Sequence, residues 1–69
     1  MEDAGYMHQA IVAAREAAAA GDVPVGAVIV DHASSRVVAV AGNRVEQDND
    51  PTAHAELLAI RMAARELSA

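Results

Sequence analysis

His54 and Glu56 are the side chains of this 69-residue sequence best suited to chemistry. A neutral imidazole is a common zinc ligand, and a carboxylate beside a metal can act as general acid or base. In the first turn of a helix both side chains lean toward the N-terminus, so both would reach a metal ion or water just beyond that end. The helix dipole would also favour an anion there, such as a hydroxide. A catalytic zinc ion takes three protein ligands, however, and the spacing alone favours a helix start with incidental polar residues.

The helix that carries this pair is predicted to run from 51 to 67. Asp50 is a good N-cap, and Pro51 suits the first helical position because its missing N–H would have no partner there. Apolar residues at three- and four-residue spacing predict the core face of this helix: Ala53, Leu57, Ile60, Ala64 and Leu67.

Three elements are predicted before this helix. Apolar residues at helical spacing predict a first helix over about 3–20, with Gly21 placed to end it. Two apolar runs, 25–31 and 37–41, predict a hairpin of strands joined by a turn at 32–36. Residues 42–44 would end the second strand, and a polar loop, 45–49, would then lead to Asp50.

Both predicted strands are nearly continuous apolar runs, which is typical of a sheet buried on both faces. We expect the two helices of this chain to form one covering layer. A two-stranded ribbon by itself is marginal in water. The other layer and the rest of the sheet that would stabilise it are not in these residues. The pattern indicates an α/β fold of which this sequence holds a part.

Composition limits the classes of function. The sequence has a net charge of −5 and no cysteine, and its single aromatic residue is Tyr6. An acidic balance argues against general nucleic-acid binding, and the lack of cysteine excludes disulfides and Cys-based zinc knuckles. No apolar run approaches the length of a membrane span, and the acidic N-terminus is unlike a signal peptide, so we expect a cytoplasmic protein.

Three segments, taken in order, resemble a known family. They are 23–30 (Val-Pro-Val-Gly-Ala-Val-Ile-Val), 42–44 (Gly-Asn-Arg) and 50–56 (Asp-Pro-Thr-Ala-His-Ala-Glu). Together they resemble the N-terminal half of the cytidine deaminase-like superfamily, and within it bacterial tRNA-specific adenosine deaminases. The resemblance implies a three-layer α/β/α fold, present here as helix–strand–strand–helix, with residues 1–69 forming the N-terminal part of a single deaminase domain.

The resemblance also implies roles for individual residues. His54 would be a zinc ligand, and Glu56 would carry protons between the activated water and the base. Asn43 would hydrogen-bond the target base, and Val25, Gly26 and Ala27 would line the floor of its pocket. The implied reaction is hydrolytic deamination of adenosine to inosine at the tRNA wobble position. The implied partners are the tRNA anticodon loop and, in the full-length form, a second subunit of a homodimer.

The sequence departs from the family pattern in one respect. The family's Pro-Cys-x-x-Cys motif supplies two further zinc ligands, whereas this sequence has no cysteine, and His8 and His32 are not placed to replace them. We therefore predict that this chain alone binds zinc weakly and is inactive. Two alternatives remain open: a deaminase of a free base such as guanine or cytosine, and a non-catalytic fragment that needs a complementary chain.

Overall fold

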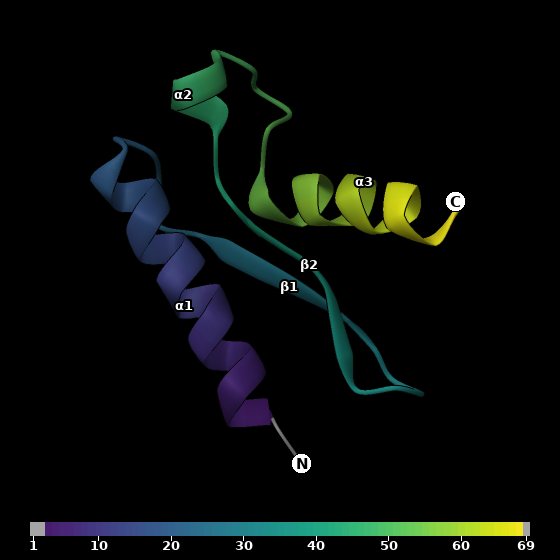
Figure 1. The fold of residues 1–69 in the computed structure, drawn as a ribbon. Coiled ribbons are helices and arrows are strands. Elements are labelled where there is room, and N and C mark those ends of the chain that lie inside the picture. The colour runs from purple at the N-terminus through teal and green to yellow at the C-terminus, as the bar shows by residue number, and fades with distance from the viewer. Residues whose placement is uncertain (1–2, 69) are drawn as a thin grey trace.

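The computed structural model describes residues 3–68 (Figure 1). The predicted order of helix, strand, strand and helix is confirmed, and a short extra helix lies in the segment predicted to be a loop. The elements are α1 (Asp3–Ala19), β1 (Gly26–Asp31), β2 (Arg36–Gly42), α2 (Val45–Asp48) and α3 (Ala55–Leu67). None of the helices in this range is long and apolar enough to cross a membrane.

Helix α1 ends in a Schellman motif at the predicted glycine. Gly21 has a φ of 91°, a left-handed conformation that glycine adopts without steric cost. The N–H of Asp22 donates to the carbonyl of Ala17 at 2.8 Å, and the N–H of Gly21 donates to that of Ala18 at 3.0 Å. This motif fixes the backbone at Asp22, which is the start of the connection to β1.

Strands β1 and β2 form an antiparallel hairpin. Gly26 pairs with Gly42 at one end and Asp31 with Arg36 at the other, and the register shifts after Ile29. The hairpin turn is tied to α1, because the hydroxyl of Tyr6 donates to the carbonyl of Ser35 at 3.0 Å.

Helix α1 packs closely against one face of the hairpin. The paired glycines Gly26 and Gly42 share this face. A Cβ on Gly26 would clash with the carbonyl oxygen of Ala10, and a Cβ on Gly42 would lie 2.6 Å from that of Ala13. The absence of side chains at these two positions therefore lets the helix backbone approach the sheet.

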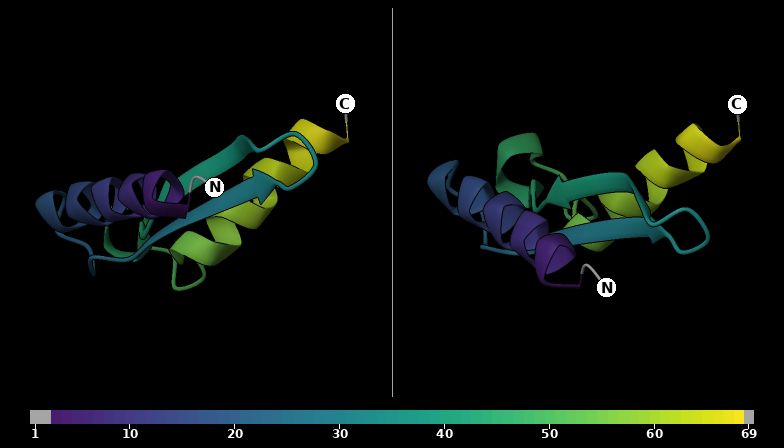
Figure 2. Two further views of the ribbon diagram at one scale, coloured as in Figure 1. Left: turned by 90° about the horizontal axis from the view of Figure 1, so that it is seen from below. Right: turned by 60° about the horizontal axis from the view of Figure 1, so that its bottom comes forward.

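Helix α3 covers the opposite face. Ala39 lies on the other side of the pleat from Gly42 and is buried together with Ala59 and Ala63 of α3, while Ala27 and Ile29 pack around them. Figure 2 shows the strands passing between α1 and α3. The three-layer α/β/α arrangement is thus present, and the expectation that both helices form one layer is wrong: each layer receives one helix.

Two details of the last helix differ from the sequence prediction. The helix begins at Ala55, not at Pro51, because the carboxylate of Asp50 accepts hydrogen bonds from Thr52 instead, from the backbone N–H at 2.9 Å and from the hydroxyl at 2.8 Å. The N–H of Ala53 donates to the carbonyl of Asp50 at 3.0 Å and closes a turn there. Asp50 therefore caps this turn, and Pro51 lies within it.

Of the residues predicted to form the core face of the last helix, only the first is buried. Ala53 is buried, but Leu57, Ile60 and Leu67 are 43%, 54% and 63% exposed. The face toward the sheet is made of Ala55, Ala59 and Ala63, because small side chains let the helix pack closely on the strands.

Candidate functional site

The N-terminus of α3 presents the two residues selected from the sequence. His54 is the N-cap residue, with an extended backbone, and its carbonyl accepts the N–H of Leu58 at 3.0 Å. Glu56 lies in the first helical turn, and both His54 and Glu56 are exposed. Between them Ala55 is completely buried, so the imidazole and the carboxylate flank a residue that anchors the turn.

Asn43 anchors this turn from a distant part of the chain. Its side-chain oxygen Oδ1 accepts the N–H of Ala55 at 2.8 Å, which takes the place of the capping bond that the His54 side chain does not make. Asn43 is only 3% exposed, and its own N–H donates to the carbonyl of Val25 at 3.0 Å. The structure thus brings Asn43 directly to the helix start that carries His54 and Glu56.

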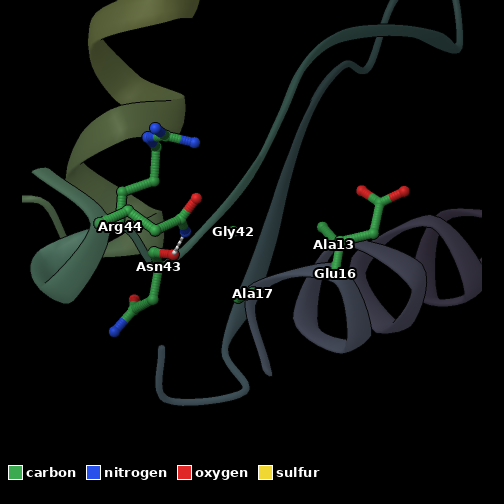
Figure 3. Close-up of a pocket in the computed structure, with 7 residues that line it drawn as sticks. Ala13, Glu16, Ala17, Gly42, Asn43 and Arg44 are labelled. Atoms are coloured by element: carbon green, nitrogen blue, oxygen red, sulfur yellow. Dashed lines mark hydrogen bonds between the residues drawn. The ribbon is translucent and has the colours of Figure 1, made fainter. Parts of the chain in front are cut away.

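The amide of Asn43 keeps one group free. Within residues 3–68 its nitrogen Nδ2 donates to no protein group. Every buried side-chain nitrogen or oxygen in that range has a hydrogen-bond partner, and Nδ2 is therefore not buried but reaches the surface. In Figure 3 the side chains of Asn43 and Arg44 extend in opposite directions from the backbone. With Oδ1 committed to the helix, Asn43 can offer a ligand a hydrogen-bond donor.

The residues predicted to form a pocket floor lie in different environments. Val25 is half-buried and contacts Asn43 through its carbonyl. Gly26 faces α1, which fills the space where its Cβ would be, and Ala27 packs in the core beneath α3. Only Val25 of these three has a direct hydrogen bond to Asn43, and substrate binding by all three stays a prediction.

A complete zinc site is not formed by the part of the chain that the structure describes. Residues 3–68 contain no group of three or more His, Cys, Asp or Glu side chains placed to hold a metal ion. His54 is an exposed imidazole at a helix N-terminus with a carboxylate nearby, which fits one ligand position and one proton carrier. His8 lies on α1 and His32 in the hairpin turn, away from α3.

Asp22 is a buried carboxylate that the sequence pattern does not single out. Its carboxylate is buried and accepts three hydrogen bonds: from the backbone N–H groups of Glu46 at 2.8 Å and Gln47 at 3.2 Å, and from Nε2 of Gln47 at 2.9 Å. Burial acts to raise the pKa of Asp22, but these hydrogen bonds outweigh it and the pKa lies below its ordinary value of 3.8. The one signal in the sequence is an acidic residue directly after Gly21, which by itself is not specific.

A small cavity lies beside Asn43 on the α1 side (Figure 3). Its volume is about 130 Å³. It is lined by Ala13, Glu16, Ala17, Gly42, Asn43, Arg44 and Gln47. Neither His54 nor Glu56 lines it, so the cavity is separate from the exposed start of α3.

Two comparisons with known sequences agree with this arrangement. Residues 1–69 match the family model of the cytidine and deoxycytidylate deaminase zinc-binding region. The chain is 48% identical over 62 residues to a tRNA-specific adenosine deaminase of Agrobacterium fabrum, and 44% identical over 63 residues to one of Aquifex aeolicus. These matches cover 90% and 91% of this chain but 40% of each relative, so the chain spans less than half the length of the relatives.

Solved structures show the same fold. A structure from a study of A-to-I editing by tRNA:A34 deaminases superposes with a TM-score of 0.88 at 42% identity, covering 99% of this chain and 51% of that one. A guanine deaminase from Bacillus subtilis superposes with a TM-score of 0.82 at 37% identity, covering 100% of this chain and 43% of that one. The whole of this chain matches the family model, and it therefore belongs to the family of the cytidine and deoxycytidylate deaminase zinc-binding region.

Proposed function

We propose that this chain is the N-terminal part of a single deaminase domain and supplies one side of a zinc-dependent site that deaminates a nucleobase. The observation that carries the proposal is the hydrogen bond from Ala55 to Asn43, because it holds a potential base-binding amide at the helix turn bearing His54 and Glu56. Adenosine at the tRNA wobble position is the proposed substrate, since the Agrobacterium and Aquifex relatives are tRNA-specific adenosine deaminases.

Each of the three side chains has a defined part in this reaction. His54 would hold the zinc ion, which when bound lowers the pKa of water and so provides a nucleophile at neutral pH. Glu56, exposed beside it, would accept a proton from that water and deliver it to the base. Asn43 would orient the base through its free Nδ2 donor. Water replaces the amino group at C6, ammonia leaves, and adenosine becomes inosine.

The remaining zinc ligands have to come from outside these 69 residues, because the described range provides no group of three metal-binding side chains. The isolated chain is therefore proposed to bind zinc weakly and to be inactive. The complete enzyme is proposed to be a cytoplasmic homodimer that binds the tRNA anticodon loop. The alternative is a non-catalytic fragment of the same fold that needs a complementary chain.

A second substrate class is supported by one specific observation. The guanine deaminase from Bacillus subtilis superposes on the full length of this chain. The described site does not distinguish a free base from a nucleoside in RNA, since an amide donor such as Asn43 serves both. A free-base deaminase with the same roles for His54 and Glu56 is the alternative proposal.

The test is to join this chain to the part of the Agrobacterium enzyme that lies beyond the matched region, and to compare the fusion with the isolated chain. Zinc content is measured by atomic absorption, inosine in an anticodon stem-loop by nuclease digestion and chromatography, and xanthine from guanine in parallel. We expect one zinc ion and inosine formation in the fusion only. A fusion that binds zinc but deaminates neither substrate would refute the proposal, and an isolated chain that does both would refute its incompleteness.

A further inference from the structure

The carboxylate of Asp22 links three segments that are far apart in the sequence. The Schellman motif at the end of α1 fixes its backbone, and the side chain is buried between α1 and α2 with 6% exposure. A buried carboxylate is costly unless its oxygens accept hydrogen bonds, and here all three donors come from Glu46 and Gln47. These hydrogen bonds therefore form only when α2 lies in this position beside Asp22.

Helix α2 depends on Asp22 for its start. Its N-cap residue is Arg44, whose side chain makes no capping hydrogen bond and pairs instead with Asp48. The first N–H groups of such a short helix need an acceptor, and Asp22 provides it from 24 and 25 residues away. Local bonds, such as that from the N–H of Asp48 to the carbonyl of Arg44 at 2.8 Å, close the turn, but the free N–H groups of Glu46 and Gln47 find their acceptor only in Asp22.

The side chain of Gln47 connects Asp22 to Asn43 by hydrogen bonds. Its Nε2 donates to Asp22 at 2.9 Å and also to the backbone carbonyl of Asn43 at 3.3 Å (Figure 3). Asn43 in turn accepts the N–H of Ala55 at the start of α3. An unbroken series of hydrogen bonds therefore runs from Asp22 through Gln47 and Asn43 to Ala55.

We propose that Asp22 is a positioning residue that holds the amide of Asn43 at the start of α3 through Gln47. The base-binding role of Asn43 rests on the proposed function, whereas the hydrogen-bonded link from Asp22 to Ala55 does not. Asparagine is a poor substitute for Asp22, because it has one side-chain oxygen for three donors and would bring its NH₂ group toward an N–H. Glutamate keeps the two acceptor oxygens on a longer stem.

The test measures hydrogen–deuterium exchange of single amides by NMR in the 69-residue chain. Asp22→Asn is expected to speed exchange of the Ala55 N–H about tenfold, while the paired amides of β1 and β2 stay within about twofold. The matched control is Asp31→Asn, which makes the same change from carboxylate to amide beside the N–H of Ala33 in the exposed hairpin turn and should leave Ala55 unchanged. Asp22→Glu should restore most of the protection at Ala55.

Three outcomes would overturn the proposal: unchanged exchange at Ala55, an equal increase at Ala55 and across the strands, or no protection of Ala55 in the unsubstituted chain. If Asp22→Asn does not fold, Gln47→Ala replaces it, because Gln47 is exposed and its loss breaks the same series of bonds. Gln47→Ala should still speed exchange at Ala55 by several-fold, with the exposed Gln9→Ala on α1 as control. Equal exchange rates of the Ala55 N–H in Gln47→Ala and Gln9→Ala would also overturn the proposal.

The fusion enzyme gives a second, functional measurement. There Asp22→Asn should lower kcat/KM about tenfold at unchanged zinc content, with rescue by Asp22→Glu. Loss of zinc along with activity would indicate a general structural role and contradict positioning. If the unsubstituted fusion binds zinc but deaminates neither substrate, the proposed function fails, while the exchange experiment still decides whether Asp22 controls the start of α3.

Discussion

The side-chain oxygen of Asn43 lies 2.8 Å from the backbone nitrogen of Ala55 and accepts its hydrogen. This bond joins the end of β2 to the start of α3, across 12 residues of sequence. One end of the Asn43 amide therefore caps α3, while the other end, Nδ2, donates to no protein group within residues 3–68 and is the proposed base-binding donor.

These two tasks predict different effects of two substitutions. Asn43→Ala leaves the buried N–H of Ala55 without an acceptor and should lower the free energy of unfolding by about 1–3 kcal/mol, measured by urea denaturation. Asn43→Asp keeps the acceptor but removes the Nδ2 donor, so it should retain more of the stability and still abolish deamination by the fusion enzyme. Equal stability of the Ala variant and the unsubstituted chain would contradict the capping role.

Close packing of α1 on the hairpin predicts that Gly26 does not tolerate a side chain. The added Cβ of Gly26→Ala would meet the backbone carbonyl of Ala10, which cannot move without shifting the helix. We expect a loss of about 1–3 kcal/mol or more in the free energy of unfolding. The control is Gly5→Ala in α1, where nothing lies within 4 Å and helix propensity predicts a gain of about 0.5–1 kcal/mol.

The orientation of α3 can be tested on two neighbouring residues. Ala59 is fully buried against the sheet, so Ala59→Leu should overpack the interface and cost about 1–3 kcal/mol in thermal or urea unfolding. Ile60 is 54% exposed, and Ile60→Ala in the isolated chain should change stability by less than about 0.5 kcal/mol. The opposite ranking would restore the core stripe predicted from the apolar spacing.

The lowered pKa of Asp22 predicts a pH dependence of stability with a defined sign. A carboxyl group whose pKa is lower in the folded state stabilises that state fully above its unfolded pKa, and the contribution is lost as pH falls through the folded pKa. The difference in free energy of unfolding between the unsubstituted chain and Asp22→Asn should be constant above about pH 5 and shrink below 3.8. If this difference in free energy instead grows on acidification, burial and not hydrogen bonding with Glu46 and Gln47 determines the pKa of Asp22.

His54 and Glu56 are predicted to matter for chemistry and not for folding. Both side chains are exposed and make no hydrogen bond within residues 3–68, so His54→Ala and Glu56→Gln should change the free energy of unfolding by less than about 0.5 kcal/mol. In the fusion enzyme Glu56→Gln should keep its zinc and lose about 10²- to 10⁴-fold in kcat, whereas His54→Ala should lose the zinc. Retained zinc in His54→Ala would remove this residue from the ligand set.

The local pattern of residues was sufficient for much of this protein. Apolar runs bounded by turn residues located both strands, and Gly21 marked the end of the first helix, because these features depend on neighbours within a few positions. The order of motifs around His54 and Glu56 likewise pointed to the deaminase family that the whole chain matches. Residue types and their spacing carry this information without reference to distant contacts.

Three features depend on contacts between distant segments and appear only in the folded chain. The cap of α3 comes from Asn43, and the cap of α2 comes from Asp22, so neither helix start could be located from its own residues. Helix α3 turns its alanines to the sheet and leaves Leu57 and Ile60 outside, because the small alanine side chains allow the helix to approach the strands closely. Periodicity predicts that a helix has an apolar side, but the packing of the whole chain decides which side is buried and which distant polar groups complete its ends.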